Sequence, residues 1–205
     1  ATSGCLLLTR DPATARWFDR AFRERRVEKE YLAVVEGSPV QDAFVIDAPL
    51  GRAEGSRVPG KVAVTTLGAA ATTRIEVLAR QGTRTLLRAR PLTGRRHQIR
   101  VHLAHVGHAI VGDLLYGGDE RAFIRFQLGQ DLAAGTGLAG GRHLLHAHRL
   151  AFREPVSRQR VEVEAPWPAD FDFGRHCNVV LRPNGPQLSA PGTTPAPGPP
   201  DRRGS

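Results

Sequence analysis

The sequence predicts an α+β fold, with a central mixed, mainly antiparallel β-sheet and a few flanking helices. Short segments in which apolar and polar residues alternate recur along the chain, as expected of half-buried strands. Fewer segments show apolar residues at the spacing of a helix. A length of 205 residues suits one domain with a substantial hydrophobic core.

The first elements expected are a buried strand and a basic helix. Residues 5–9 form a short apolar run, which is typical of a buried strand. Asp11 is placed to cap a helix and Pro12 is tolerated in a first turn, so we expect a helix that ends near Arg26. One side of this helix is apolar and the rest is basic, which predicts that it packs against a core. The apolar side consists of Trp17, Phe18, Ala21 and Phe22.

Seven further strands and a short helix are expected along the rest of the chain. Residues 51–60 contain glycine and arginine and should form a loop. Residues 119–143 show no sustained period, so we expect a variable insertion there with one short helix near residues 121–128. The expected strands are residues 31–35, 44–46, 62–66, 73–78, 83–90, 144–152 and 160–164.

The run TGRRHQIRVHL, residues 93–103, concentrates basic and imidazole side chains at the start of a predicted helix. Gly94 breaks the preceding strand pattern, so this helix can span residues 95–106. Arg96 and Arg100 would then lie one turn apart and could bind phosphate or carboxylate. The alternative is a solvated basic face with no specific partner. The residues expected to face the core are Ile99, Leu103 and Val106.

The charge balance favours an anionic partner. The formal net charge is +9, and RNA, DNA or an anionic membrane surface would each fit such a positive field. All basic residues except Lys29 and Lys61 are arginine. Arginine suits phosphate binding and base stacking, although coding bias in a GC-rich genome explains the same skew.

The cysteines and the hydropathy pattern bear on the compartment. Cys5 and Cys177 are too far apart to suggest a zinc motif or a disulfide framework, which favours a reducing compartment. No apolar stretch is long enough to span a bilayer, and no secretory signal is present. We therefore expect a cytoplasmic protein, or an organellar one if a targeting segment precedes this sequence.

The composition changes after Arg182. The last 23 residues contain seven prolines and four glycines and have almost nothing apolar to bury. We expect residues 183–205 to be a disordered tail and residues 1–182 to form one domain.

Four segments, in this order, resemble the RluA-like family of RNA pseudouridine synthases. They are KEYLAVVEG (29–37), the HQIR run, GHAIVGDLLYGG (107–118) and LLHAHRLAF (144–152). The opening TSGCLLLTRD is similar to the end of the family segment that contains the catalytic aspartate. The resemblance implies the family's catalytic fold and the isomerisation of uridine in rRNA or tRNA to pseudouridine. It implies no metal and no other cofactor.

The resemblance also implies roles for particular residues. Tyr31 is expected to stack on the target base and to take part in proton transfer, and Arg100 to pair with the nucleophilic aspartate. In the family this aspartate lies just upstream of the TSG triplet, whereas this sequence begins at Ala1. The sequence also contains no methionine, so we expect it to be an inactive fragment of a longer protein. An unpaired Arg100 would then turn to water or to another carboxylate such as Asp113.

Other residues are expected to support the site or to contact RNA. Thr2, Ser3 and Gly4 would shape the turn after the catalytic loop, and Lys29 would support the strand that carries Tyr31. The residues expected to contact the RNA backbone or to brace the site are Arg95, Arg96, His97 and Gln98. The pairs His102/His105 and His146/His148 suggest a metal, but no carboxylate or cysteine cluster completes a ligand set, so we expect none.

The sequence therefore predicts a pseudouridine synthase domain that binds RNA and acts as a monomer. The alternative is a noncatalytic RNA-binding protein with the same basic cleft. A membrane-surface protein is disfavoured, because the helices lack clustered aromatic anchors.

Overall fold

The structure, a computed structural model, describes residues 2–130, 142–168, 171, 181–182 and 185–186. The helices among these residues are α1 (Pro12–Arg23), α2 (Gln98–His105) and α3 (Glu120–Gln127). The first strands are β1 (Ser3–Gly4), β2 (Glu28–Glu36), β3 (Ala43–Asp47), β4 (Leu50–Arg52) and β5 (Val62–Val64). The later strands are β6 (Thr72–Gln81), β7 (Arg84–Pro91), β8 (Leu145–Arg153), β9 (Arg160–Glu164), β10 (Leu181–Arg182) and β11 (Gly185–Pro186).

A seven-stranded mixed sheet forms the centre of the protein. Its order is β1-β8-β2-β7-β6-β3, and β9 also pairs with β8. Only the β1–β8 pair is parallel among the described strands, so the prediction of a mixed, mainly antiparallel sheet is confirmed. Two small antiparallel pairs, β4–β5 and β10–β11, lie outside this sheet.

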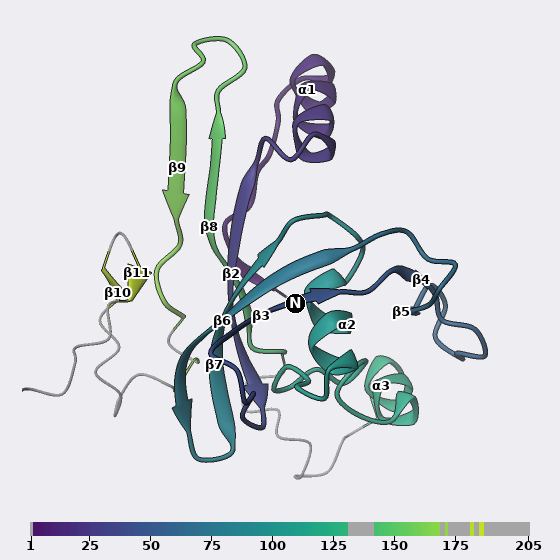
Figure 1. Cartoon of the computed structure of the whole chain (residues 1–205). Coiled ribbons are helices and arrows are strands. Elements are labelled where there is room, and N and C mark those ends of the chain that lie inside the picture. Colours follow the sequence, from purple (N-terminus) through teal and green to yellow (C-terminus); the bar gives the residue numbers. More distant parts are fainter. Residues whose placement is uncertain (1, 131–141, 169–170, 172–180, 183–184, 187–205) are drawn as a thin grey trace, which may run out of the picture.

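The main hydrophobic core lies between the sheet and α2, which lies beside one face of the sheet (Figure 1). Ile99 and Leu103 of α2 belong to the same buried cluster as Leu87 of β7. Residues 85–89 of β7 are all buried, so this central strand is not half-buried as its alternation predicted. Arg88 can lie in it because Glu30 and Glu76 accept hydrogen bonds from its guanidinium at 2.9 and 2.8 Å.

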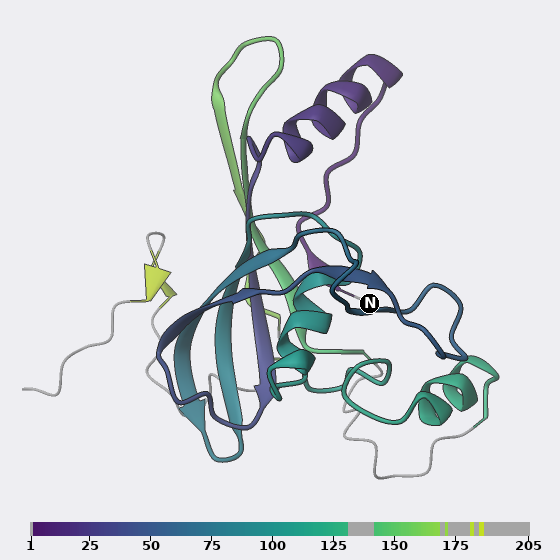
Figure 2. The ribbon, with the colours of Figure 1, turned by 45° about the vertical axis from the view of Figure 1, so that its right-hand side comes forward.

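A smaller core joins α1 to the outer half of β8. Phe18 and Ala21 of α1 are buried there, and Phe152 of β8 packs edge-on against Phe18 at 4.9 Å between ring centroids. Figures 1 and 2 both show α1 and the β8–β9 hairpin extending from the same end of the sheet, away from α3. The predicted N-cap of this helix is confirmed, because the Asp11 carboxylate accepts a hydrogen bond of 2.8 Å from the Thr14 backbone N–H.

The prediction of a buried strand at residues 5–9 is wrong. Strand pairing ends at Gly4, and Leu6 and Leu8 are 80% and 81% exposed. The edge of β8 that β1 pairs with is occupied further along by β9, so the chain leaves the sheet and crosses to α1. Apolar composition alone could not reveal this competition for one strand edge.

The helix predicted at residues 95–106 begins later and ends earlier. α2 starts at Gln98 because His97 has a left-handed backbone, with φ of 54°. Arg96 therefore precedes the helix and does not share a helical face with Arg100. Ile99 and Leu103 face the core as predicted, whereas Val106 lies past the end of the helix and is 38% exposed.

The remaining predicted elements agree with the structure to within a few residues, including α3 at the short helix expected in the insertion. β4 lies at the start of the segment predicted to be a loop. The predicted tail, residues 183–205, lies outside the described residues except for Gly185–Pro186. No helix of the described residues is both long and apolar enough to cross a bilayer.

Candidate active site

A cavity of about 380 Å³ opens between β2, the start of α2 and the segment that precedes β8. Its size falls within the range of about 300–1,000 Å³ that is typical of small-molecule sites. Most of the residues singled out from the sequence meet in its wall. The lining residues are Thr2, Lys29, Tyr31, Pro91, Thr93, Gly94, Arg95, His97, Gln98, Ile99, Arg100, His143 and Leu145.

Tyr31 reaches the cavity from the middle of β2. The pairing of β2 with β8 shifts register between Glu30 and Tyr31, and such a β-bulge redirects the side chains beside it. The ring packs against the main core, while the hydroxyl makes no hydrogen bond to any described residue. Burial raises the pKa of Tyr31, so the phenol stays protonated at neutral pH.

Lys29 lies two residues before Tyr31 on the same strand and donates a hydrogen bond of 3.3 Å to the Thr93 carbonyl oxygen. Burial lowers the pKa of its ammonium group. Lys29 thus ties β2 to the loop that leads into α2.

Gln98 organises that loop. Its side-chain oxygen accepts hydrogen bonds from the Thr93 hydroxyl at 2.7 Å and from the Arg95 backbone N–H at 2.9 Å. Its side-chain nitrogen donates to the Thr72 carbonyl oxygen and the Thr73 hydroxyl, both at 3.0 Å. These four bonds use the donors and acceptors of a side chain that is only 4% exposed. They favour bracing of the site over contact with the RNA backbone.

Arg100 and Asp113 form a bidentate ion pair at the back of the cavity. The guanidinium donates from Nε and Nη2 to the two carboxylate oxygens, each at 2.7 Å. The Arg100 side chain also lies 4.8 Å from the centroid of the Tyr116 ring. Burial alone would raise the pKa of Asp113, but the hydrogen bonds and charge of Arg100 outweigh it and the net shift is downward.

Asp113 is not placed to attack a substrate. Its side chain has no exposed surface, and it does not line the cavity. Its Oδ1 also accepts hydrogen bonds of 3.1 Å from the backbone N–H groups of Leu115 and Tyr116. Asp113 therefore orients Arg100. The sequence predicted Asp113 as a carboxylate to which Arg100 could turn, and the two side chains are paired.

His97 connects the cavity to Tyr116. The two rings pack edge to face at 5.6 Å between centroids, and His97 Nδ1 lies 2.8 Å from the Tyr116 hydroxyl. That hydroxyl accepts a hydrogen bond of 3.3 Å from the Val62 backbone N–H. Burial, followed by the charges of Arg100 and Arg96, lowers the pKa of His97, so the ring is neutral at neutral pH.

Thr2 enters the cavity wall where the chain joins the sheet. Its hydroxyl lies 3.2 Å from His143 Nε2, and the Ser3 hydroxyl lies 2.9 Å from His146 Nδ1. Gly4 follows with φ of 106°, and a Cβ there would lie 2.2 Å from the Ala147 carbonyl oxygen. Only glycine fits this position, which explains the third residue of the TSG triplet.

Two exposed arginines, Arg95 and Arg96, lie at and beside the rim of the cavity. Arg95 lines the cavity and donates from Nε to the Ala70 carbonyl oxygen at 3.1 Å. Arg96 lies outside the cavity wall against Gly60, in the loop that joins β4 to β5. Both side chains are therefore placed at the surface, where phosphate groups have access.

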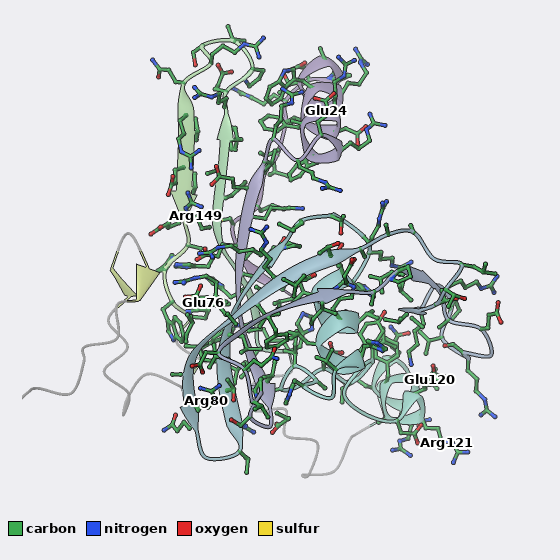
Figure 3. All side chains as sticks on the ribbon, viewed as in Figure 1. Glu24, Glu76, Arg80, Glu120, Arg121 and Arg149 are labelled. Atoms are coloured by element: carbon green, nitrogen blue, oxygen red, sulfur yellow. The ribbon has the colours of Figure 1, made fainter. Side chains whose placement is uncertain are left out.

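The β4–β5 loop and α3 lie on one side of the molecule (Figure 3), and hydrogen bonds join them. Glu120, the first residue of α3, accepts hydrogen bonds from Lys61 at 2.8 Å and from the Ser56 hydroxyl at 2.7 Å. These bonds, with a third from the Arg57 backbone N–H, lower the pKa of Glu120 to about 2. Glu120 thus anchors the loop that contacts Arg96.

The histidine pairs do not form a metal centre among the described residues. His102 is fully buried, with Nδ1 2.9 Å from the Thr73 hydroxyl and Nε2 2.9 Å from the Ala48 carbonyl oxygen. Nowhere in the described ranges do three or more His, Cys, Asp or Glu side chains gather in a way that could hold a metal ion.

The chain is similar to proteins of one known family. A family profile described as RNA pseudouridylate synthase matches residues 1–105. The chain belongs to the RluA-like RNA pseudouridine synthases. It is 36% identical over 175 residues to an uncharacterized RNA pseudouridine synthase of Zymomonas mobilis, covering 84% of this chain and 72% of that protein.

Other RluA-like relatives are longer. The chain is 38% identical over 184 residues to an uncharacterized RNA pseudouridine synthase of Mycobacterium bovis, covering 90% of this chain and 54% of that protein. It is 36% identical over 171 residues to ribosomal large subunit pseudouridine synthase D of Haemophilus ducreyi, covering 83% and 50%. The chain spans about half the length of most of these curated relatives.

A solved structure of human RNA pseudouridylate synthase domain containing 1 resembles this chain, with a TM-score of 0.60 and 27% identity. The likeness covers 82% of this chain and 70% of the human chain. The predicted RluA-like fold is therefore confirmed.

Most of the site residues predicted from the sequence meet at this cavity. Thr2, Lys29, Tyr31, Arg95, His97, Gln98 and Arg100 line the cavity, whereas Ser3, Gly4 and Arg96 do not. His143 and Thr93 were missed. His143 directly precedes the LLHAHRLAF segment, and its position beside a recognised motif was the available signal. Thr93 gave no chemical signal, because its role depends on hydrogen bonds to Gln98 and Lys29.

Proposed function

We propose that this cavity isomerises uridine in RNA to pseudouridine. The observation that carries the proposal is the convergence of Tyr31, Arg100 and Lys29 in one cavity, with Arg95 in its wall and Arg96 exposed next to it in the chain. Membership of the RluA-like family supports the same reaction.

The reaction requires that the target base leave the RNA stack. The glycosidic C–N bond breaks, the uracil turns while it is held, and a C–C bond forms from the base to the same sugar carbon. A stacked base cannot turn in this way, so the nucleotide must be flipped into a pocket. A cavity of about 380 Å³ is large enough for a nucleobase, and the rim arginines can bind the flanking phosphates.

Arg100 is suited to hold a second carboxylate in addition to Asp113. A guanidinium has five N–H donors, and Asp113 uses one on Nε and one on Nη2. The family resemblance places the nucleophilic aspartate just upstream of the TSG triplet, before Ala1, and Thr2 of that triplet lines the same cavity. A carboxylate at that position would enter beside Arg100, which would keep it ionised and orient it for attack.

Tyr31 provides a face on which the base can stack and a hydroxyl group beside it. Its ring is held by the core, so it can stack on the uracil without a large entropy cost. After the C–C bond forms, the base carbon must lose its proton, and the nitrogen released from the sugar must gain one. The Tyr31 hydroxyl is protonated at neutral pH and has no partner among the described residues, so it can relay this proton, accepting it on its oxygen as it gives up its own.

The proposed partner is rRNA or tRNA, bound by a monomer in the cytoplasm, with no metal or other cofactor. Recognition would depend on RNA shape and unpaired nucleotides more than on duplex sequence. The basic rim and the net charge of +9 favour RNA over a neutral ligand.

Tritium release from RNA labelled at uracil C5 tests this function. We compare this chain with a protein that extends upstream through the aspartate expected before Thr2. We expect release from the extended protein and none from the shorter chain. RNA binding that is intact and sensitive to salt, without release from either protein, would instead support the noncatalytic RNA-binding alternative.

A further inference from the structure

His97 is held in an unusual backbone conformation at the mouth of the cavity. Its φ of 54° and ψ of 19° are left-handed, a region that non-glycine residues rarely adopt because it is strained. Gln98 fixes the chain on the other side through its bond to the Arg95 backbone. A strained residue that its surroundings hold in place is a candidate for a functional role.

The Tyr116 hydroxyl is the hydrogen-bond partner of His97 Nδ1. This hydroxyl accepts a hydrogen bond from the Val62 backbone N–H, so its own proton needs an acceptor. Among the described residues that acceptor is His97 Nδ1, at 2.8 Å. When the Tyr116 hydroxyl donates to Nδ1, the neutral imidazole carries its proton on Nε2.

The surroundings of His97 disfavour its charged form. The groups that face it are Arg96, Arg100, Tyr116 and Asp113, and Asp113 is already paired with Arg100. Lys61 adds a further positive charge, 5.8 Å from the centroid of the Tyr116 ring. The N–H group of a neutral His97 is suited to an uncharged acceptor such as a carbonyl oxygen. The exposed guanidinium groups of Arg95 and Arg96 are instead suited to the negative charge of phosphate.

We propose that His97 is a specificity-determining residue that donates a hydrogen bond from its Nε2–H to a carbonyl oxygen of the uracil held in the cavity. This inference rests on the proposed function, because it requires a flipped uracil in this cavity. Tyr116 acts through His97 as a positioning residue that fixes the tautomer. A ring held in this way presents a donor without reorganisation when the base enters.

Substitutions at His97 and Tyr116 test the inference. They are made in the protein that extends upstream through the expected aspartate, called the full-length protein below, and activity is measured as tritium release from RNA labelled at uracil C5. His97→Gly accepts the left-handed backbone but has no donor, so we expect kcat/KM to fall about 10- to 30-fold. His97→Asn also tolerates this backbone and keeps an N–H donor, so we expect it to recover part of the loss. Tyr116→Phe removes the hydroxyl that fixes the tautomer of His97. We expect a smaller fall in kcat/KM, about 3- to 10-fold.

The salt dependence of RNA binding distinguishes a base contact from a phosphate contact. If His97 contacts the base, the slope of log affinity against log salt concentration in His97→Gly equals that of the wild type. The matched control, Arg96→Gln, should lose one phosphate contact, so its affinity should depend less steeply on salt and the magnitude of the slope should fall by about one. Nitrogen NMR of the imidazole in the same protein should show the proton on Nε2 at neutral pH.

Three results would overturn the inference. They are an unchanged kcat/KM in His97→Gly, a slope reduced by about one in that variant, and a proton on Nδ1 or on both nitrogens. A wild-type protein that releases no tritium would instead refute the proposed function, and the inference with it.

Discussion

The Arg100 guanidinium and the Asp113 carboxylate are joined by two hydrogen bonds of 2.7 Å, although 13 residues separate them in the chain. Arg100 is on α2, whereas Asp113 lies in the loop between α2 and α3. The carboxylate is fully buried and Arg100 is 14% exposed. The pair thus positions a cation in the cavity wall and ties the loop that carries Tyr116 to α2.

Removing the charge of Asp113 should destabilise the protein strongly. Asp113→Asn leaves the buried Arg100 without its counter-ion, and loss of one partner of a buried pair costs roughly 3–5 kcal/mol. The free energy of unfolding from urea denaturation measures this cost. The matched control is Asp42→Asn, because Asp42 pairs with Arg80 but is 82% exposed. A cost below about 1 kcal/mol is expected there, and equal costs for the two variants would contradict the account.

Replacing Gly4 should disrupt the entry of the chain into the sheet. In Gly4→Ala the new Cβ would overlap the Ala147 carbonyl oxygen, and the left-handed backbone would be strained. We expect the free energy of unfolding to fall by more than about 2 kcal/mol, with loss of tritium release by the full-length protein.

Gly55→Ala separates the two causes in the Gly4 variant. Gly55 also has positive φ, 72°, but no atom lies within 4 Å of its Cβ position, so only backbone strain of about 1 kcal/mol is expected. Gly118→Ala, with neither feature, should be neutral. A Gly4→Ala cost no larger than that of Gly55→Ala would show that the close approach to Ala147 is unimportant.

His143 should make stability depend on pH in a defined window. Burial, followed by the charge of Arg100, lowers its pKa from 6.5 to about 4. Between these values the unfolded chain binds a proton that the folded protein does not, so the free energy of unfolding falls as the pH falls from 6.5 to 4. His97 and His102 add to the fall in the same direction.

The contribution of His143 is the difference between the wild type and His143→Gln. We expect the wild type to lose up to about 1.4 kcal/mol more per pH unit in this window. Urea denaturation at several pH values measures both slopes. Parallel stability curves would mean that His143 titrates normally in the folded protein.

The sequence predicted the elements whose patterns are local. The N-cap at Asp11, the alternation in β6 and the motif residue Tyr31 each depend on a few neighbouring residues, and each lies where it was expected. The start of α2 was misplaced because the left-handed turn at His97 depends on Tyr116 and Gln98. The strand expected at residues 5–9 failed because β9 occupies the same edge of β8.

The contacts between residues of the site were harder to predict from the sequence than the residues themselves. Asp113 was considered as a partner of Arg100 from charge alone, but its complete burial depends on the loop around it. His143 and Thr2 meet although 141 residues separate them. Such contacts require the sheet to be assembled first, and no local pattern encodes them.

Tritium release by Tyr31→Phe in the full-length protein tests the central claim most directly. The substitution removes one hydroxyl that has no partner among the described residues, so stability and RNA affinity should match those of the wild type. If this cavity is the site of isomerisation, release should fall about 10²- to 10⁴-fold. Release at the wild-type rate, with normal RNA affinity, would show that the reaction does not occur beside Tyr31.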